Sequence, residues 1–204
     1  MPRLSEATRQ RRRDDIAAAA MRCFARDGFA RTSMADIIRE AGSSSGSVYS
    51  NFENKTDLVR YAAGGALRQL LGAASTEPSA ASSPSTLLAR LMRASADRAH
   101  AETLLQIWAE ASRDPDLAEV TQRTTLELRT SIEVMLLPWC QANAVAPEVE
   151  ADRLADAVLV ALQGFIVRLA IDRDVAPEAL VDRTIAVFSR AYDLTSSTRG
   201  NRTG

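Results

Sequence analysis

The chain has 204 residues, of which 46% are hydrophobic and 25% charged, so it has enough apolar material for a core and is not disordered as a whole. It shows no apolar run near the ~20 residues of a membrane span, and it begins with a polar segment instead of an export signal. We therefore expect a cytoplasmic protein. Cys23 and Cys140 indicate no disulfide framework, and with His100 as the only histidine they offer no zinc site. No cofactor or metal is expected.

The formal net charge of −1 conceals an uneven distribution of charge along the chain. Residues 1–60 contain 11 basic and 8 acidic residues, whereas residues 61–204 contain 14 basic and 18 acidic ones. Such a basic end favours a polyanionic partner. The cluster Arg9–Arg13 is interpreted either as a solvated helix face or as an arm that reaches such a partner.

The pattern of hydrophobic residues predicts helix almost throughout. No segment alternates with period 2, and good helix formers dominate. A first helix is expected over about 6–26, followed by a short helix capped by Ser33, a short polar helix near 44–51, and a helix opened by Asn54 and Asp57. Further helices are expected at about 86–100, 102–113, 115–143, 147–172 and 177–194. The predicted fold class is all-α, with about nine helices.

Two of these short helices, joined by a tight turn that contains Gly42, form a helix-turn-helix. The second helix carries mostly serines, with Tyr49 and Asn51, around a minimal apolar anchor. A helix that enters the DNA major groove presents hydroxyls, amides and small side chains, because its backbone has to approach the DNA. Gly46 suits that need, since it has no Cβ to hold the helix away from phosphate. The motif therefore predicts DNA binding.

The segment Gly28–Gly42, followed by Gly46, Val48–Tyr49, Phe52, Lys55 and Leu58, resembles the DNA-binding signature of TetR-type transcriptional regulators. The rest of the chain matches that family only in pattern, as an all-helical regulatory domain. The resemblance implies a homodimer that binds double-stranded palindromic operator DNA, usually a repressor that a small-molecule effector releases.

This resemblance divides the chain into three regions. Residues 1–54 are the expected DNA-binding domain, a three-helix head that contains the helix-turn-helix. Residues 55–194 are the expected helical domain for ligand binding and dimerisation, and residues 195–204 are an expected disordered tail. A low-complexity stretch at residues 74–86, with two prolines among small polar residues, is expected to be a mobile connector.

The expected DNA-binding residues lie on the helix-turn-helix and at the start of the next helix: Thr32, Ser33, Ser44, Ser45, Gly46, Ser47, Tyr49, Asn51 and Lys55. Tyr49 is interpreted as a phosphate contact or as a core tyrosine with a surface hydroxyl. Lys55, the only lysine, is expected to reach the DNA backbone. The chain departs from the family at Ser43, where an apolar residue is usual, at Ser45, where a basic or larger one is common, and at Asn51, where His or Tyr is common.

Large apolar side chains on the later helices suit a pocket for an apolar or amphipathic effector. The candidate lining comprises Met92, Trp108, Met135, Trp139 and Phe165, with His100 as a polar partner. Core packing of the apolar side chains and a structural role for His100 are the alternatives. Gly164, inside an apolar helical run, would be explained by a close helix crossing or by a ligand.

Dimerisation is expected through the helices at 147–172 and 177–194, because both are apolar over a wider arc than one buried face needs. The expected interface residues are Leu154, Val158, Leu162, Phe165, Leu169, Leu180, Val187 and Phe188. Two helices from each chain would form a four-helix interface with two-fold symmetry. The alternative is that both helices belong wholly to the core of one chain.

The sequence thus predicts a DNA-binding transcriptional regulator, a repressor whose operator affinity falls when a small ligand binds. The competing interpretation is a helical interaction or scaffold protein with a vestigial helix-turn-helix. An enzyme is not expected, since the chain shows no nucleophile elbow, P-loop or dinucleotide fingerprint.

Overall fold

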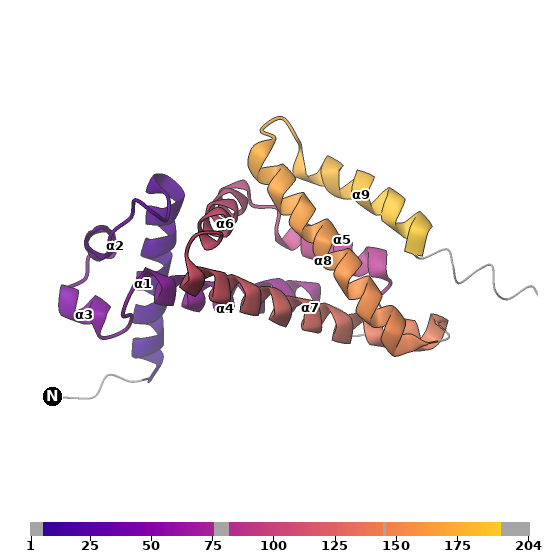
Figure 1. Cartoon of the computed structure of the whole chain (residues 1–204), viewed down its shortest axis with the longest axis horizontal. Coiled ribbons are helices and arrows are strands. Elements are labelled where there is room, and N and C mark those ends of the chain that lie inside the picture. The colour runs from indigo at the N-terminus through magenta and orange to yellow at the C-terminus, as the bar shows by residue number, and fades with distance from the viewer. Residues whose placement is uncertain (1–5, 76–81, 145, 193–204) are drawn as a thin grey trace, which may run out of the picture. The chain divides into compact units, whose positions relative to one another are not determined.

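The computed structural model describes residues 6–75, 82–144 and 146–192, and these ranges contain nine α-helices and no strand (Figure 1). In chain order they are α1 (Glu6–Asp27), α2 (Met34–Glu40), α3 (Ser45–Tyr49), α4 (Lys55–Ala74), α5 (Pro84–Ala94), α6 (Arg98–Ala111), α7 (Pro115–Asn143), α8 (Pro147–Ile171) and α9 (Pro177–Tyr192). The predicted all-α class is confirmed. The expected tail at 195–204 and residues 76–81 of the expected connector lie outside the described residues.

One helix boundary differs from the prediction. The expected helix at 86–100 is interrupted at Ser95–Asp97, so that α5 ends at Ala94 and α6 begins at Arg98. The Asp97 carboxylate accepts a hydrogen bond from the backbone N–H of His100 over 2.7 Å. An acid in that position satisfies one of the free N–H groups at a helix start, and it therefore fixes the beginning of α6.

The helices form two compact units, each made of two segments of the chain. The first comprises Met1–Leu67 and Glu102–Thr124, and the second comprises Arg68–Ala101 and Thr125–Gly204. The first turns of α4 thus belong to the unit that contains α1, α2 and α3, whereas the sequence placed a domain boundary after residue 54.

The first unit is built on the inner face of α1. Ile16, Ala20, Cys23 and Phe24 recur at three- and four-residue steps and are buried. They share one apolar cluster with Phe29, Ile37, Val48, Phe52, Leu58, Val59, Ile107, Leu117 and Val120. α2 and α3 each bury a single residue of their own, Ile37 and Val48 respectively, so most side chains of these two helices stay at or near the surface.

Two glycines end the first two helices in a conformation that other residues avoid. Gly28 has φ +84° and follows α1, and its N–H donates to the carbonyl oxygen of Phe24 over 2.9 Å. Gly42 has φ +57° and follows α2. Both are left-handed C-terminal stops, which only glycine adopts without a steric cost. They set the direction in which the chain leaves each helix.

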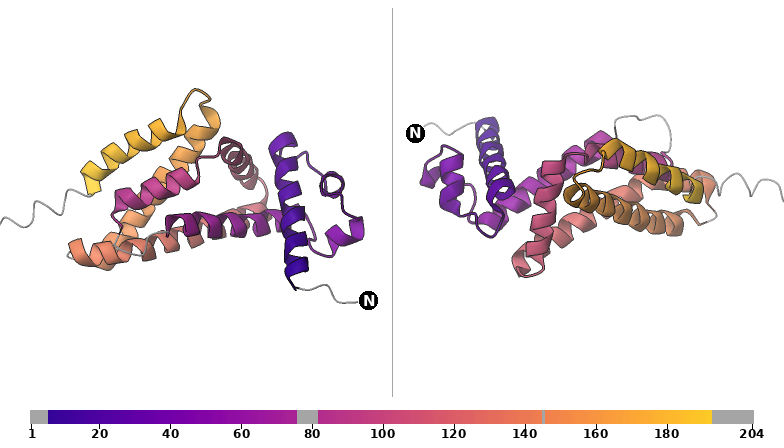
Figure 2. Two further views of the ribbon diagram at one scale, coloured as in Figure 1. Left: turned by 180° about the vertical axis from the view of Figure 1, so that it is seen from behind. Right: turned by 90° about the horizontal axis from the view of Figure 1, so that it is seen from above.

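In the second unit α5 packs against both α8 and α9 (Figures 1 and 2). α5 contributes a continuous apolar face that includes Leu87, Leu88, Leu91 and Met92, all of them buried. Each of these residues recurs at the helical spacing that places side chains on one face. α5 is therefore the central core helix of this unit.

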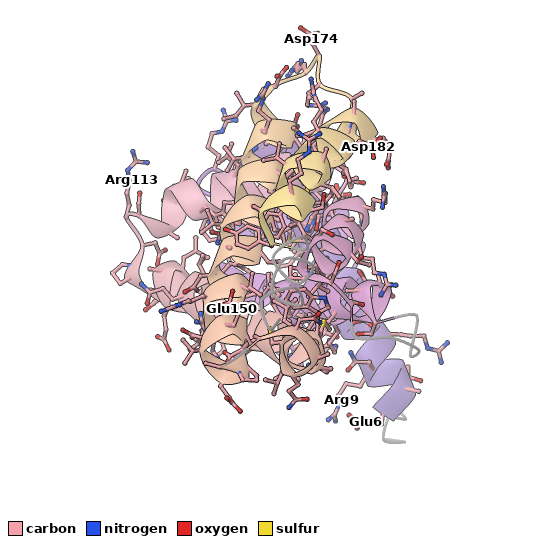
Figure 3. All side chains as sticks on the ribbon, turned by 90° about the vertical axis from the view of Figure 1, so that its right-hand side faces the viewer. Glu6, Arg9, Arg113, Glu150, Asp174 and Asp182 are labelled. Atoms are coloured by element: carbon pink, nitrogen blue, oxygen red, sulfur yellow. The ribbon has the colours of Figure 1, made fainter. Side chains whose placement is uncertain are left out.

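Arg98 ties the beginning of α6 to the end of α8. Its Nη1 donates to the carbonyl oxygens of Leu169 and, over 2.9 Å, of Asp172, and its Nη2 donates to that of Val175 over 3.0 Å. A cation near a helix C-terminus is also favoured by the helix dipole. One guanidinium thus satisfies carbonyl groups of the last turn of α8 and of the loop before α9, whose tip Asp174 marks in Figure 3.

By length and composition, α8 could cross a membrane, although no such run was expected from the sequence. Nine of its side chains are buried within the chain, and they include Leu154, Val158, Leu162 and Phe165. Burial of this kind is what the core helix of a folded domain shows, and it accounts for the apolar composition of α8.

Candidate nucleic-acid interface

α2, the turn after it and α3 form the predicted helix-turn-helix. Within the turn, the N–H of Ser43 donates to the carbonyl oxygen of Ile38 over 3.3 Å, and that of Gly42 to the carbonyl oxygen of Arg39 over 3.2 Å. The carboxylate of Glu40 at the end of α2 binds Arg22 and Arg26 of α1 over 2.8 and 3.1 Å. α2 is thereby held to α1 by ion pairs at the surface as well as by the buried core.

The two short helices begin with serine caps. The side chain of Ser33 accepts a hydrogen bond from the N–H of Asp36, whose carboxylate accepts in return from the backbone N–H and hydroxyl of Ser33. These hydrogen bonds, with a further one from Arg39, lower the pKa of Asp36 to about 2. Ser44 caps α3 with a single hydrogen bond, which its side chain accepts from the N–H of Ser47 over 3.3 Å. Both serines remain exposed.

The outer face of α3 is polar and open. Ser45 and Gly46 are exposed, and the side chain of Tyr49 is 53% exposed. A Cβ built on Gly46 would meet no atom within 4 Å, so nothing in the chain itself requires a glycine there. Space of this kind allows another backbone to approach the helix closely.

Three of the residues that the sequence assigned to DNA form hydrogen bonds within the chain. Thr32 is 2% exposed, and its hydroxyl donates to the carbonyl oxygen of Gly28 over 2.8 Å. The side-chain amide of Asn51 donates to the carbonyl oxygen of Ser47 over 2.8 Å. The Lys55 ammonium donates to the carbonyl oxygen of Phe29 over 2.7 Å. In these orientations the three side chains satisfy the backbone of neighbouring turns.

The structure also separates Arg13 from the arginine cluster of α1. Arg9, Arg11 and Arg12 are exposed, and Figure 3 shows Arg9 near Glu6 at the start of the helix. Arg13 is half-buried, since it shares a helix face with Ile16 and Ala20. Arg13 precedes these buried positions by three and seven residues, a spacing that places all three on one face of the helix. This spacing distinguishes Arg13 from the other arginines already in the sequence, although the sequence prediction took them as one cluster.

The proposed effector-binding residues divide between the two units. Met92 and Phe165 are buried in the second unit, where Met135, Trp139 and His100 are half-buried. Trp108, also half-buried, belongs to the part of α6 in the first unit. Five of the six candidates therefore belong to the same compact unit.

Most of the residues expected at a dimer interface lie inside the single chain. Five of them on α8 are at most 3% exposed: Leu154, Val158, Leu162, Phe165 and Leu169. On α9, Phe188 is buried and Leu180 half-buried, and only Val187 is open, with 69% of its surface exposed. The apolar side chains that α8 leaves exposed are Val149, Val160 and Ile171. Apolar residues cover a wide arc of α8 because one side of the helix packs in the core and another side is also apolar but exposed.

A three-helix head with a solvent-facing second helix of a helix-turn-helix, followed by a helical unit with its own core, defines a DNA-binding regulator with a separate regulatory domain. Residues 16–62 match the family described as "Bacterial regulatory proteins, tetR family", and residues 84–190 match "BetI-type transcriptional repressor, C-terminal". Together the matches span most of the described chain. The chain belongs to the TetR family of bacterial regulatory proteins.

Individual relatives agree with this assignment. The chain is 29% identical over 178 residues to the HTH-type transcriptional repressor Rv1474c of Mycobacterium tuberculosis. The aligned region covers 85% of this chain and 90% of that protein. The fold is similar to that of Salmonella enterica GusR, with a TM-score of 0.73, 22% identity, and coverage of 94% of this chain and 100% of that one. It is also similar to a putative transcriptional regulator from Saccharomonospora viridis in complex with choline, with a TM-score of 0.65, 18% identity, and coverage of 89% and 96%.

Proposed function

We propose that this TetR-family repressor binds operator DNA as a homodimer through α3, and that a small molecule bound in the second unit lowers the operator affinity. The observation that carries the DNA-binding part is the polar outer face of α3, on which Ser45 and Gly46 are exposed and no protein atom covers the glycine. A helix with only Val48 buried contributes little to the core. Its open face fits readout of bases far better than a vestigial role in a scaffold.

Contacts to the DNA are proposed to divide into two kinds. Ser45 and Ser47 on α3 read bases, because their short hydroxyl side chains let the helix enter the major groove deeply. Tyr49, with its exposed ring, and the caps Ser33 and Ser44 bind backbone phosphates and so set the register of the head on the DNA. Lys55 supports these contacts from within the head by holding the turn at Phe29.

A second copy of the chain is proposed to cover the exposed apolar stripe of α8 and α9. The stripe comprises Val160, Gly164 and Ile171 on α8, together with Val187 on α9. A Cβ at Gly164 would meet nothing within 4 Å, so the close helix approach that would explain this glycine is not made within one chain. Two such copies related by a two-fold axis would present two α3 helices to a palindromic operator whose half-sites lie roughly 34–36 Å apart.

The effector is proposed to be apolar or amphipathic and to lie among Met92, Met135, Trp139 and Phe165, with His100 as a polar neighbour. Choline is the first probe, because the similar regulator from Saccharomonospora viridis holds it. To act on transcription, the effector has to prefer the arrangement of heads that does not fit the operator, since equal binding to both arrangements shifts nothing. A bacterial repressor that acts on genomic DNA works in the cytoplasm.

The deciding experiment is fluorescence anisotropy with labelled DNA from the region upstream of this protein's own coding sequence, compared with a scrambled fragment at several salt concentrations. Preferential binding of the upstream DNA that weakens steeply with salt is expected. Equal or absent binding to both fragments would favour the scaffold interpretation. The matched variant is Ser45→Leu, which leaves the buried Val48 in place and should abolish the preference without lowering the melting temperature.

A further inference from the structure

The guanidinium of Arg13 lies over two aromatic rings of the first unit. Its central carbon lies 4.5 Å from the ring centre of Tyr61 on α4 and 5.1 Å from that of Phe52. The two rings meet edge to face at 5.4 Å. Cation–π contacts with two rings favour a guanidinium at this place and restrict its movement. Arg13 is thereby held at the place where α1, α4 and the end of α3 come together.

Arg13 has no charge partner among the described residues. The neighbouring carboxylate of Asp14 accepts hydrogen bonds from the Tyr61 hydroxyl and from the Gln10 amide. The Nε atom of Arg13 is buried without a hydrogen-bond partner. By contrast, four other arginines of the first unit form ion pairs: Arg22, Arg26, Arg39 and Arg60. A cation that has lost part of its hydration and gained no counterion is a binding group for an anion.

The position of Arg13 indicates which anion it meets. Phe52 continues the last turn of α3, because its N–H donates to the carbonyl oxygen of Val48 over 3.0 Å. Arg13 therefore lies against the C-terminal end of the helix that faces the DNA. The major groove is only ~12 Å wide, so that groups at the ends of a helix inserted in it lie close to the phosphate backbone. A guanidinium matches a phosphate with two parallel hydrogen bonds.

We propose that Arg13 binds a phosphate of the operator backbone beside the C-terminal end of α3, in an orientation fixed by the rings of Phe52 and Tyr61. This contact rests on the proposed binding of DNA through α3 and adds a positioning residue that precedes the helix-turn-helix itself. The rings restrict the guanidinium before DNA arrives, so less side-chain entropy is lost on binding. The contact fixes the register of the head and carries no base preference.

The salt dependence of operator binding tests the proposal. Each phosphate contact releases counterions, so log affinity falls as log salt concentration rises. Arg13→Gln should make this negative slope shallower by about 1 per head. Arg13→Lys should bind more weakly than the natural protein and keep the slope, because it retains the charge without the guanidinium. The matched control is Arg22→Gln, which removes the same charge from the same helix, where Glu40 already neutralises it, and should leave the slope unchanged. Circular dichroism verifies that each variant is folded.

Operators with single neutral methylphosphonates give a second test that does not depend on the stability of a variant. One position in each half-site should weaken binding of the natural protein most and of Arg13→Lys less, and should leave binding of Arg13→Gln almost unaffected. If Arg13→Gln keeps the full salt slope, or if every neutral position weakens all proteins equally, Arg13 only braces the two rings and the proposal is overturned. Failure of the natural protein to prefer the operator would instead overturn the proposed function, and the Arg13 contact with it.

Discussion

Lys55 donates a hydrogen bond to the carbonyl oxygen of Phe29, 26 residues earlier, and its ammonium lies 4.5 Å from the centre of the Phe29 ring. The first residue of α4 therefore holds the turn between α1 and α2, which leads directly to the Ser33 cap. The sequence predicts that Lys55 reaches the DNA backbone, and in the structure its side chain bonds to the protein backbone.

Partial burial lowers the pKa of Lys55 below its ordinary value of 10.5, although Glu110 and Asp114 oppose the shift. A lowered pKa means that folding disfavours the charged form. The contribution of Lys55 to the free energy of unfolding should therefore rise with pH between the folded pKa and 10.5. Because Lys55 is the only lysine, protein labelled with ¹³C at the lysine ε-carbon should give one resonance that titrates below 10.5. The same resonance in denaturant is the control, and a folded pKa at or above that in denaturant would contradict the burial.

Thr32→Val should destabilise the head without weakening its contact with DNA. The substitution removes the hydroxyl that donates to Gly28 and should lower the free energy of unfolding by about 1 kcal/mol. The buried side chain of Thr32 faces no solvent, so operator affinity measured well below the melting temperature should stay within about twofold. Ser33→Ala is the comparison, since it removes an exposed cap and should reduce both stability and affinity. Equal losses of affinity in the two variants would refute the inward orientation of Thr32.

Val160→Glu should dissociate the proposed dimer while each chain stays folded. The side chain of Val160 is 66% exposed, and a carboxylate buried there by a second copy would raise the dimer dissociation constant at least ~100-fold. Val134→Glu on α7 is the matched control, because Val134 is 65% exposed and lies outside the proposed stripe. Light scattering measures the mass in solution, and a dimer mass that Val160→Glu leaves unchanged would show that the stripe is not the interface. Phe165→Glu should instead unfold the second unit, since Phe165 is 3% exposed.

Helical periodicity predicts the elements of this fold well because the cause is local. The serine caps, the two stop glycines and the proline starts of α7, α8 and α9 act within one turn of the chain. The sequence shows which residues of α8 are apolar, yet its periodicity does not say whether Phe165 or Val160 is buried in the core of the same chain. Thr32 and Asn51 donate to carbonyl oxygens only four residues earlier, yet the helical pattern alone does not say whether such a side chain turns to its own backbone or to solvent. The partner of Lys55 lies 26 residues earlier, and it becomes defined only when the helices are packed together.

Arg98→Met should loosen the junction between α8 and α9. The substitution keeps an unbranched apolar stem but removes the guanidinium that donates to the carbonyl oxygens of Leu169, Asp172 and Val175. Loss of hydrogen bonds from a charged group should lower the free energy of unfolding by about 1.5–3 kcal/mol. Arg98→Lys should recover only part of this loss, because a single ammonium cannot match the planar fork. Denaturant unfolding measures the effect, and faster amide hydrogen exchange at residues 172–176 should accompany it. Full stability in Arg98→Met would show that the hydrogen bonds of Arg98 contribute nothing to the stability of the fold.

Binding of an effector should be visible at Trp139 and should weaken operator binding by a matching factor. Trp139 is half-buried in the second unit, to which most of the other candidate pocket residues belong, whereas Trp108 lies in the first unit. The variants Trp108→Phe and Trp139→Phe therefore separate the two fluorescence signals. Titration with choline, and then with apolar and amphipathic compounds, should change the emission of Trp139 saturably in the Trp108→Phe protein. Thermodynamic linkage requires that saturating operator DNA weaken the compound by the same factor by which the compound weakens the DNA, typically about 5- to 150-fold. A compound that saturates Trp139 and leaves operator affinity unchanged would refute the coupling, because it would then bind both arrangements of the heads equally.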